Sequence, residues 1–314
     1  VAYHDKGKAE DPVRYALIVA KKPGTPSSSS LPPGIDRTAS VDRERIAHLS
    51  TTPLLTGPQS TTWVPANDPR IARQSRALVD AVQAQLAAGG DVDLAKVQFP
   101  AVTAESAREG KAGVDALVVL AHPDDESVYT GGTIAALTKA GKSVSLAVAT
   151  DGGGGRGGNG ADLQAMRGAE LAGAVAALGI KTAPAMLGFK DIGKYKDAHR
   201  SEPLTAGDTL RAGGFDKLVE KLVKQIRTER PKALLTFDSS RDPNFSLHGH
   251  HLAVGTAAAV AVALAADPSA FPEQLAKGLK PWAVLEQDVV VPHGSPAQNG
   301  VVDVPIDPQA NGPQ

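Results

Sequence analysis

A short polar stretch, HPDDE, directly follows an apolar run of the kind that forms a buried strand. Its His122 and Asp125 stand three positions apart, and a tight turn containing Pro123 can direct both side chains into one space. A catalytic zinc ion usually takes about three nitrogen or oxygen ligands from the protein and keeps one position open for water. The stretch therefore offers two metal ligands, and the third must come from elsewhere in the chain.

A second cluster of histidines lies in the later stretch SLHGHHLAVG. His248, His250 and His251 all stand at the expected start of a helix that follows a strand, which places them at the same sheet edge as HPDDE. We expect His250 to face away from the metal. Asp124 is then free to act as a general base on a water activated by the metal.

A His-Pro-Asp turn on its own is more often a capped turn than a metal site. Two further observations favour metal binding here: the second histidine cluster, and the absence of cysteine from the chain. Without cysteine there are no disulfides, thiolate ligands or cysteine nucleophiles, so histidine and carboxylate side chains are the candidate ligands.

The composition excludes several classes of partner. The 33 basic and 34 acidic residues are scattered through the 314-residue chain, so neither nucleic acid nor anionic lipid is an expected partner. The longest apolar run, Leu252 to Ala266, is shorter than the roughly 20 residues that span a bilayer and is typical of a buried helix. Because the sequence starts at Val1 instead of Met, we expect that a leader was removed and that the protein is exported.

The elements that must position these residues begin after an N-terminal extension. Residues 1–112 are broken by Pro, Ser and Thr and predict a largely irregular extension, which could contact a protein partner. One helix is expected near 69–88, because Asp68 can cap it, Pro69 suits its first position and Gly89 follows its last turn.

From residue 113 to 314, strand-like and helix-like runs alternate. The expected strands are Ala116–Ala121, Ser143–Thr150, Ala183–Leu187, Ala233–Phe237 and Ala283–Val291, and the expected helices are Gly131–Ala140, Ala161–Leu178, Phe215–Thr228 and Gly249–Ala266. Continuous apolar strands indicate a sheet covered on both faces. We predict an α/β fold of the doubly wound, Rossmann-like type, with a mainly parallel sheet, helices on both faces and a binding crevice beyond the carboxyl ends of the strands.

Other catalytic patterns are weaker. Gly152, Gly154 and Gly157 match G-x-G-x-x-G, but no acidic residue ends a following strand as a dinucleotide site requires, so we interpret them as a rim close to the metal. No G-x-S-x-G pattern of a serine hydrolase is present. Asp124 and Asp125 are neighbours on one turn and could not flank a glycosidic bond at about 5 to 9 Å.

In several places the sequence resembles the PIG-L/LmbE family of zinc-dependent N-acetylglucosamine deacetylases. AHPDDE is followed by GGT, then by TDGGGG, by an R..E...A...LG pattern from Arg167 to Gly179, and by H-x-x-H at His248 to His251. The resemblance covers about Val114 to Asp307. It implies that Zn²⁺, or another divalent ion, is bound by His122, Asp125 and His251, that Asp124 is the base, that His248 is the acid or stabilises the oxyanion, and that Arg167 and Asp191 hold sugar hydroxyls.

The function implied by this resemblance is removal of an acetyl group from an N-acetylglucosamine-type small molecule or glycan. The chain departs from the family where members usually read His-Pro-Asp-His, because Gly249 and His250 replace the middle pair and a carboxylate that would orient a histidine is missing. The polar insertion from Lys190 to Gly214 is expected to reshape the substrate mouth. The alternative is an exported envelope or surface protein that keeps the metal-binding fold but binds a glycan or another protein; an insertion (191–214) that plugs the metal site would favour it.

Overall fold

The structure is a computed structural model that describes residues 16–17, 62–154, 160–192, 194–196, 199–201, 205–239, 247–284, 286–290 and 302–303. Gly157, the last glycine of the G-x-G-x-x-G match, lies outside these ranges. Among the helices in the described ranges, none combines the length and the apolar character needed to cross a membrane.

Five strands form the central sheet: β4 (Val114–Leu120), β5 (Val144–Thr150), β6 (Ala185–Phe189), β9 (Pro231–Phe237) and β10 (Glu286–Val290). Every neighbouring pair runs parallel. The inner strands consist mainly of Val, Leu and Ala because helices cover both sides of the sheet. The predicted parallel sheet is confirmed, with strand ends that differ from the expected ones by only a few residues.

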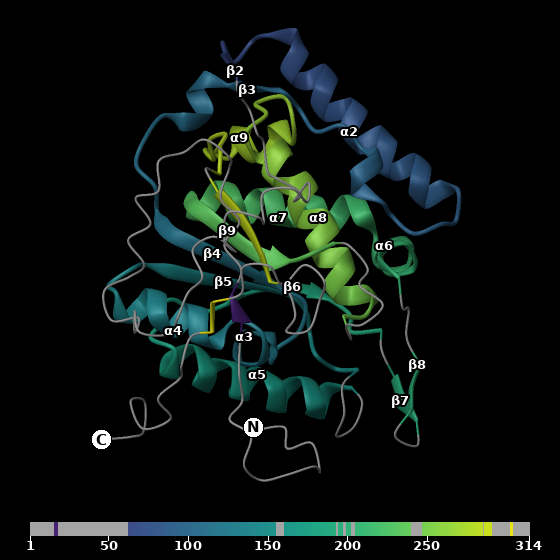
Figure 1. Ribbon diagram of the computed structural model, residues 1–314, viewed down its shortest axis with the longest axis vertical. Coiled ribbons are helices and arrows are strands. Elements are labelled where there is room, and N and C mark those ends of the chain that lie inside the picture. Colours follow the sequence, from purple (N-terminus) through teal and green to yellow (C-terminus); the bar gives the residue numbers. More distant parts are fainter. Residues whose placement is uncertain are drawn as a thin grey trace.

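The strand order in space is β10-β9-β4-β5-β6. The direction in which successive strands are added across the sheet therefore reverses next to β4. The chain runs outward from β4 through β5 to β6, then crosses back to β9 on the other side of β4 and continues to β10 (Figure 1). In a doubly wound sheet, ligands bind beyond the carboxyl ends of the strands at such a reversal. A binding site is therefore expected at the carboxyl ends of β4 and β9.

Helices lie on both faces of this sheet, as predicted. On one side lie α4 (Gly131–Lys139) and α5 (Ala161–Ala177), and on the other α7 (Phe215–Glu229) and α8 (Gly249–Ala265) (Figure 1). The inner face of α7 is apolar at helical spacing and is fully buried at Leu222, Val223 and Ile226. These helices end within a residue of their expected ends.

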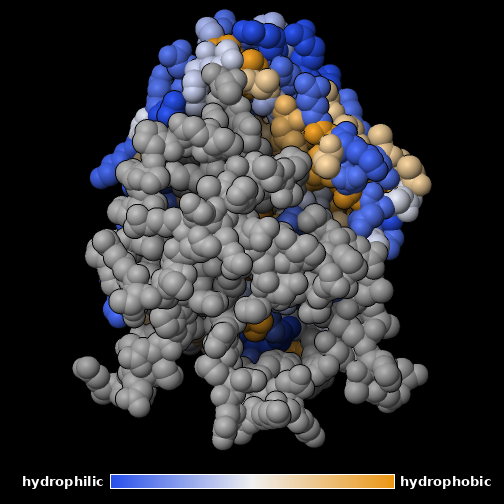
Figure 2. Space-filling view, in the orientation of Figure 1, coloured by the Kyte–Doolittle hydropathy of each residue, from blue (hydrophilic) through white to orange (hydrophobic). Residues whose placement is uncertain are grey.

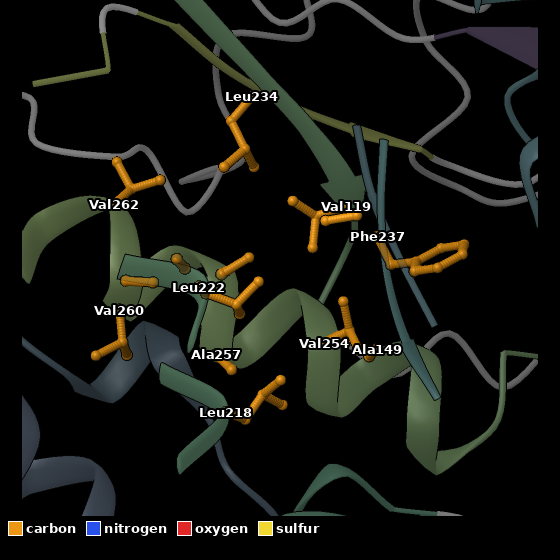
Figure 3. Packing of buried hydrophobic residues seen from close by; sticks show 14 of the residues in the cluster. Val119, Ala149, Leu218, Leu222, Leu234, Phe237, Val254, Ala257, Val260 and Val262 are labelled. Carbon is orange, nitrogen blue, oxygen red and sulfur yellow. The ribbon is translucent and has the colours of Figure 1, made fainter. Parts of the chain in front are cut away.

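Helix α8 is buried along its whole length, which suits a helix that is apolar on every side. It packs on α7 and on strands β9 and β4, with Val254, Ala257 and Val260 among the labelled core side chains in Figure 3. Gly255 lets its backbone come close to β9, because a Cβ atom there would lie 2.4 Å from the carbonyl oxygen of Phe237. The start of α8 is thereby held against the end of β9.

Helix α2 (Pro69–Ala87) also packs against α8, on the far side from the sheet (Figure 1). Its buried side chains Leu78, Val82 and Leu86 belong to the same core as the strands. Its exposed side carries charged residues in the first half of the helix and alanines beside polar residues in the second, and Figure 2 shows hydrophilic and hydrophobic residues side by side at this end of the molecule. The helix predicted near 69–88 is confirmed, with Asp68 accepting a hydrogen bond from the backbone N–H of Arg70.

Two short strands flank this helix, β2 (Thr62–Val64) and β3 (Val102–Ala104), and they pair in parallel. The 3₁₀ turn η2 (Leu94–Lys96) precedes β3 and the 3₁₀ turn η3 (Glu105–Arg108) follows it. The small apolar cluster of these strands includes Ala266 and Ala283 from the C-terminal part of the chain. A separate pair of short strands, β1 (Ala16–Leu17) and β11 (Val302–Asp303), is antiparallel. The division of the chain at residue 112 stays a prediction.

The polar insertion after β6 contains the antiparallel strands β7 (Lys194–Lys196) and β8 (His199–Ser201), followed by α6 (Ala206–Gly213). Helix α6 is joined to the turn after α2, where the Gly207 N–H donates to Asp91 Oδ1. Another short helix, α9 (Pro272–Ala276), follows α8. Several residues of the insertion lie outside the described ranges, so its predicted effect on the substrate mouth stays a prediction.

Candidate metal centre and active site

The turn after β4 brings His122 and Asp125 together, as their spacing predicts. Asp125 opens the one-turn helix α3 (Asp125–Val128), and its Oδ2 accepts the backbone N–H groups of Ala121, at 3.0 Å, and of His122, at 2.8 Å. The same oxygen lies 3.5 Å from Nδ1 of His122. These bonds hold the carboxylate beneath the imidazole ring.

The first turn of α8 supplies the other histidines to this place. His251 Nε2 lies 3.2 Å from Asp125 Oδ1, and His251 Nδ1 lies 3.3 Å from the backbone nitrogen of His248. The ring of His122 is 4.8 Å, between centroids, from both the His248 and the His251 ring. Residues from the ends of β4 and β9 thus meet at the reversal of strand order.

Donor atoms suited to a divalent metal converge here. His122, His248 and His251 each offer a ring nitrogen within 4.8 Å of the others, and a second set combines His122 with Asp124 and Asp125. Burial opposes ionisation of Asp125, but His251 and His122 hold the pKa of its carboxyl well below the usual range. An ionised carboxylate beside buried imidazoles fits a site for zinc or a similar ion.

Asp124 lies at the rim of this cluster, with 41% of its side chain exposed. Desolvation at the rim and the negative charge of Asp125 raise its pKa, against the opposing charges of Arg167 and His122. Arg167 donates to Oδ2 of Asp124 and, at 3.2 Å, to the carbonyl oxygen of Gly152. A solvent-facing carboxylate with a raised pKa suits the predicted role of proton acceptor.

His250 lies inside the cluster instead of pointing out of it, but it contacts the ring nitrogen of His122 that faces away from Asp125, so its expected orientation away from the metal stays a prediction. Its Nδ1 lies 2.9 Å from Nε2 of His122, and the side chain is only 3% exposed. The reason is that α8 points its N-terminal end, not one side, towards β4. Side chains on different sides of the first turn, such as His250 and His251, therefore both reach the ring of His122.

Asp191, which follows β6, reaches the same cluster from a third segment. Its Oδ1 lies 3.5 Å from His250 Nδ1, and its Oδ2 lies 3.9 Å from Nη1 of Arg167. The exposed fraction of the side chain is 1% for Asp191 and 13% for Arg167. Contact of these two residues with sugar hydroxyls stays a prediction.

Comparison with known proteins finds a family match over the segment that contains these residues. Residues 117–262 match the PIG-L family, described as GlcNAc-PI de-N-acetylase. The chain carries a PIG-L family domain. The matched segment contains every predicted catalytic, metal-binding and sugar-binding residue, so the resemblance inferred from the motifs is confirmed.

Curated proteins are also similar to this chain. The chain is 37% identical over 187 residues to a 1D-myo-inositol 2-acetamido-2-deoxy-alpha-D-glucopyranoside deacetylase of Thermobispora bispora, over 54% of this chain and 56% of that protein. It is 35% identical over 188 residues to a protein of the same name from Nakamurella multipartita, over 55% of this chain and 61% of the other. The chain thus spans little more than half the length of these relatives.

A solved structure, an N,N'-diacetylchitobiose deacetylase from Pyrococcus horikoshii, aligns with a TM-score of 0.46 and 26% identity. The alignment covers 58% of this chain and 62% of that one.

The glycine-rich loop of the PIG-L domain lies against the HPDDE turn. At Gly152, φ is +71°, and a Cβ atom would lie 3.0 Å from the ring of Pro123 and 3.2 Å from Cδ of Arg167. The loop is fastened by Asp151, which accepts from the N–H groups of Gly153 and Asp191, each at 3.1 Å. In its described part the loop therefore lies beside the site, as interpreted from the sequence.

Sequence reasoning missed the aromatic wall behind His251. The rings of Phe237 and Tyr129 lie 4.6 Å and 5.5 Å from the His251 ring, between centroids. Phe237 ends β9 and Tyr129 follows α3, so both stand where strand ends meet the site. The available signal was Tyr129, four residues after Asp125; Phe237 stands eleven residues before His248 and carried no such local signal.

Proposed function

We propose that this chain is a metal-dependent hydrolase that removes the acetyl group from a small N-acetylglucosamine-type substrate. The observation that carries the proposal is the meeting of His122, Asp125 and His251 at the strand-order reversal, with Asp124 at the open rim. The names of the relatives, deacetylases of an inositol-linked 2-acetamido sugar, support the same reaction and substrate class.

The residues proposed to hold the ion are His122, Asp125 and His251. Zn²⁺ is the proposed ion, because imidazole and carboxylate donors without thiolates are common in catalytic zinc sites. A bound zinc ion supplies Lewis acidity, which polarises an amide carbonyl and lowers the pKa of water. The aromatic rings of Phe237 and Tyr129 limit the movement of His251 and so preserve its orientation.

Asp124 is proposed to take the proton from the attacking water. The water oxygen forms a bond to the acetyl carbon, the C–N bond breaks, and the proton passes to the leaving nitrogen, so that acetate and a free amine result. The raised pKa of Asp124 makes its carboxylate a stronger base and so favours taking the proton. His248, whose ring centroid is 4.2 Å from that of His251, is proposed to donate to the oxyanion that develops on the acetyl oxygen.

Arg167 is proposed to connect the sugar to the base. It pairs with Asp124 and is more exposed than Asp191, so a sugar hydroxyl can reach its guanidinium group more easily than the buried carboxylate. Asp191, whose Oδ2 lies 3.9 Å from Nη1 of Arg167, offsets part of the positive charge of Arg167. The bond from Arg167 to the carbonyl of Gly152 holds the guanidinium in place while the substrate binds.

The proposal is tested by measuring acetate release from a panel of N-acetylglucosamine-containing compounds with zinc-loaded protein. We expect Asp124→Asn to lower the rate by about 10²- to 10⁴-fold, because it removes the base while keeping the side-chain shape. Metal content, measured in parallel, should not change. If folded, metal-loaded wild-type protein releases no acetate from any compound in the panel, deacetylation of simple amino sugars is excluded.

A further inference from the structure

His122 presents its two ring nitrogens to two different groups of donors. Nδ1 lies 3.5 Å from Oδ2 of Asp125, on the side of the proposed metal ligands. Nε2 lies 2.9 Å from Nδ1 of His250, and the same nitrogen of His250 lies 3.5 Å from Oδ1 of Asp191. The side chains of His122, His250 and Asp191 are 5%, 3% and 1% exposed, so water screens this contact only weakly.

The distance of 2.9 Å constrains the protons. Two imidazole nitrogens this close share one hydrogen, because two N–H groups or two lone pairs would repel. A neutral imidazole that binds a metal through one nitrogen carries its hydrogen on the other. If His122 uses Nδ1 as the ligand, its Nε2–H must donate, and His250 Nδ1 is the acceptor in reach.

We propose that His250 is a positioning residue that orients His122 for metal binding, with Asp191 behind it. The inference rests on the metal centre of the proposed function. Metal-binding histidines almost always donate their second nitrogen to a fixed acceptor, and the loss of that acceptor typically weakens metal binding 10- to 100-fold. In this chain, a histidine of α8 and a carboxylate after β6 together take the part of the carboxylate missing from the late histidine motif.

Asp191 contributes charge and placement. Its Oδ1 lies 3.5 Å from His250 Nδ1, so its negative charge strengthens the acceptor side of the hydrogen bond from His122. Its backbone N–H donates to Asp151 Oδ1 at 3.1 Å, which fixes the segment after β6. The effect of Asp191 passes through His250 and should be the smaller of the two.

The same three side chains could in principle hold a second metal ion instead. The guanidinium of Arg167, with Nη1 3.9 Å from Asp191 Oδ2, places a positive charge against such an ion. The contact of 2.9 Å is also an ordinary hydrogen-bond length. We therefore favour the positioning role, and the number of ions bound per chain decides between the two.

The test is a Co²⁺ titration of the full-length, metal-stripped chain, followed by the visible absorption of bound Co²⁺ and by equilibrium dialysis. The variants are His250→Ala, His250→Asn, Asp191→Asn and, as a control, Thr256→Val. Asn at position 250 can place its Oδ1 near the original Nδ1 and so keep an acceptor. Thr256 is equally buried in α8, but its hydroxyl donates to the carbonyl of Leu252 in the same helix.

We expect one ion per wild-type chain and a 10- to 100-fold weaker affinity in His250→Ala, with a changed Co²⁺ spectrum. His250→Asn should recover most of the affinity, Asp191→Asn should lose less than His250→Ala, and Thr256→Val should bind as the wild type does. Unchanged affinity and spectrum in folded His250→Ala would overturn the inference, as would an equal loss in Thr256→Val.

A wild-type chain that binds two ions, and only one after His250→Ala, would replace the positioning role with a second metal site. If the wild-type chain binds no Co²⁺ at all, the metal centre itself fails, and the proposed function fails with it. Failure of the inference alone is thus distinguishable from failure of both.

Discussion

At the scale of single residues, two adjacent aspartates differ in pKa because their surroundings differ. Asp125 is 3% exposed and Asp124 is 41% exposed in the side chain. Positive and hydrogen-bonding partners outweigh burial at Asp125 and lower its pKa, whereas burial and the neighbouring charge prevail at Asp124 and raise its pKa. One carboxylate is thus suited to bind a cation and the other to exchange protons.

His248 and His251 should likewise have different functions. We expect His251→Ala to lose bound zinc and activity together, because it removes a proposed ligand, while His248→Ala keeps the metal and loses about 10²- to 10³-fold in kcat. Metal analysis by mass spectrometry together with acetate-release rates measures both quantities. Retention of a full zinc equivalent by His251→Ala would contradict the assigned ligands.

At the scale of elements, α8 connects the core to the site, because its first turn carries the histidines and its remaining turns are buried. Its start is held by the close approach to β9 at Gly255, and its far end is held by Arg227 of α7. The proposed chemistry therefore depends on packing that lies well away from the metal ligands.

Gly255→Ala is predicted to destabilise the fold by about 1 to 3 kcal/mol, because the new methyl group meets the carbonyl oxygen of Phe237, which is backbone and cannot move aside easily. Urea unfolding measures this change. Zinc affinity should fall as well, since α8 must shift with its histidines. A substitution at Gly173 of α5, where a Cβ atom meets nothing within 4 Å, is the matched control and should leave zinc affinity unchanged.

Arg227 joins α7 to the C-terminal end of α8. It is 1% exposed and donates to several backbone carbonyls, those of Ala265, Leu264, Asp267, Ala270 and Phe271. Burial lowers its pKa to about 10, which still leaves it charged at neutral pH.

Arg227→Met should therefore destabilise the protein by about 3 kcal/mol or more, because it leaves buried carbonyl groups without a donor. Thermal unfolding tests this, with Arg73→Met on the exposed face of α2 as the control. Equal melting temperatures for the two variants would show that the buried network contributes little.

At the scale of the whole molecule, polar contacts connect three strands at their amino-terminal ends, opposite to the site. Asp115 of β4 accepts from Lys232 of β9 at 2.6 Å and from the backbone N–H of Ser143, next to β5, at 2.9 Å. The hydrogen bond from Lys232 is the largest cause that lowers the pKa of Asp115, to about 2. The site and this ionic contact lie at opposite ends of the same strands.

This contact predicts a pH dependence of stability. Because the pKa of Asp115 is lower in the folded chain, its contribution is fully present above the pKa of the unfolded chain, near 4, and is lost as the pH falls towards 2. Asp115→Asn should cost ~1 kcal/mol at pH 7, discounted for the exposure of Lys232, and almost nothing at pH 2. Urea unfolding of both proteins across this range provides the measurement; a difference that does not depend on pH would show that the charge of Asp115 does not matter.

Local sequence was sufficient for the main strands and helices and for much of the site. The apolar strands, the helix punctuation at Asp68 and the HPDDE turn all depend on residues within a few positions of one another, so their pattern could be interpreted directly. The placing of His122 and His251 at one sheet edge also followed, because parallel strands share the edge at which their carboxyl ends lie.

Only the tertiary structure decided the orientation of His250, the pairing of Arg167 with Asp124 and the approach of Asp191. These contacts join segments far apart in the sequence, and they depend on the angle at which α8 and the loops after β5 and β6 meet the sheet. That angle is set by packing, including the close approach at Gly255, and no local pattern of residue types encodes it.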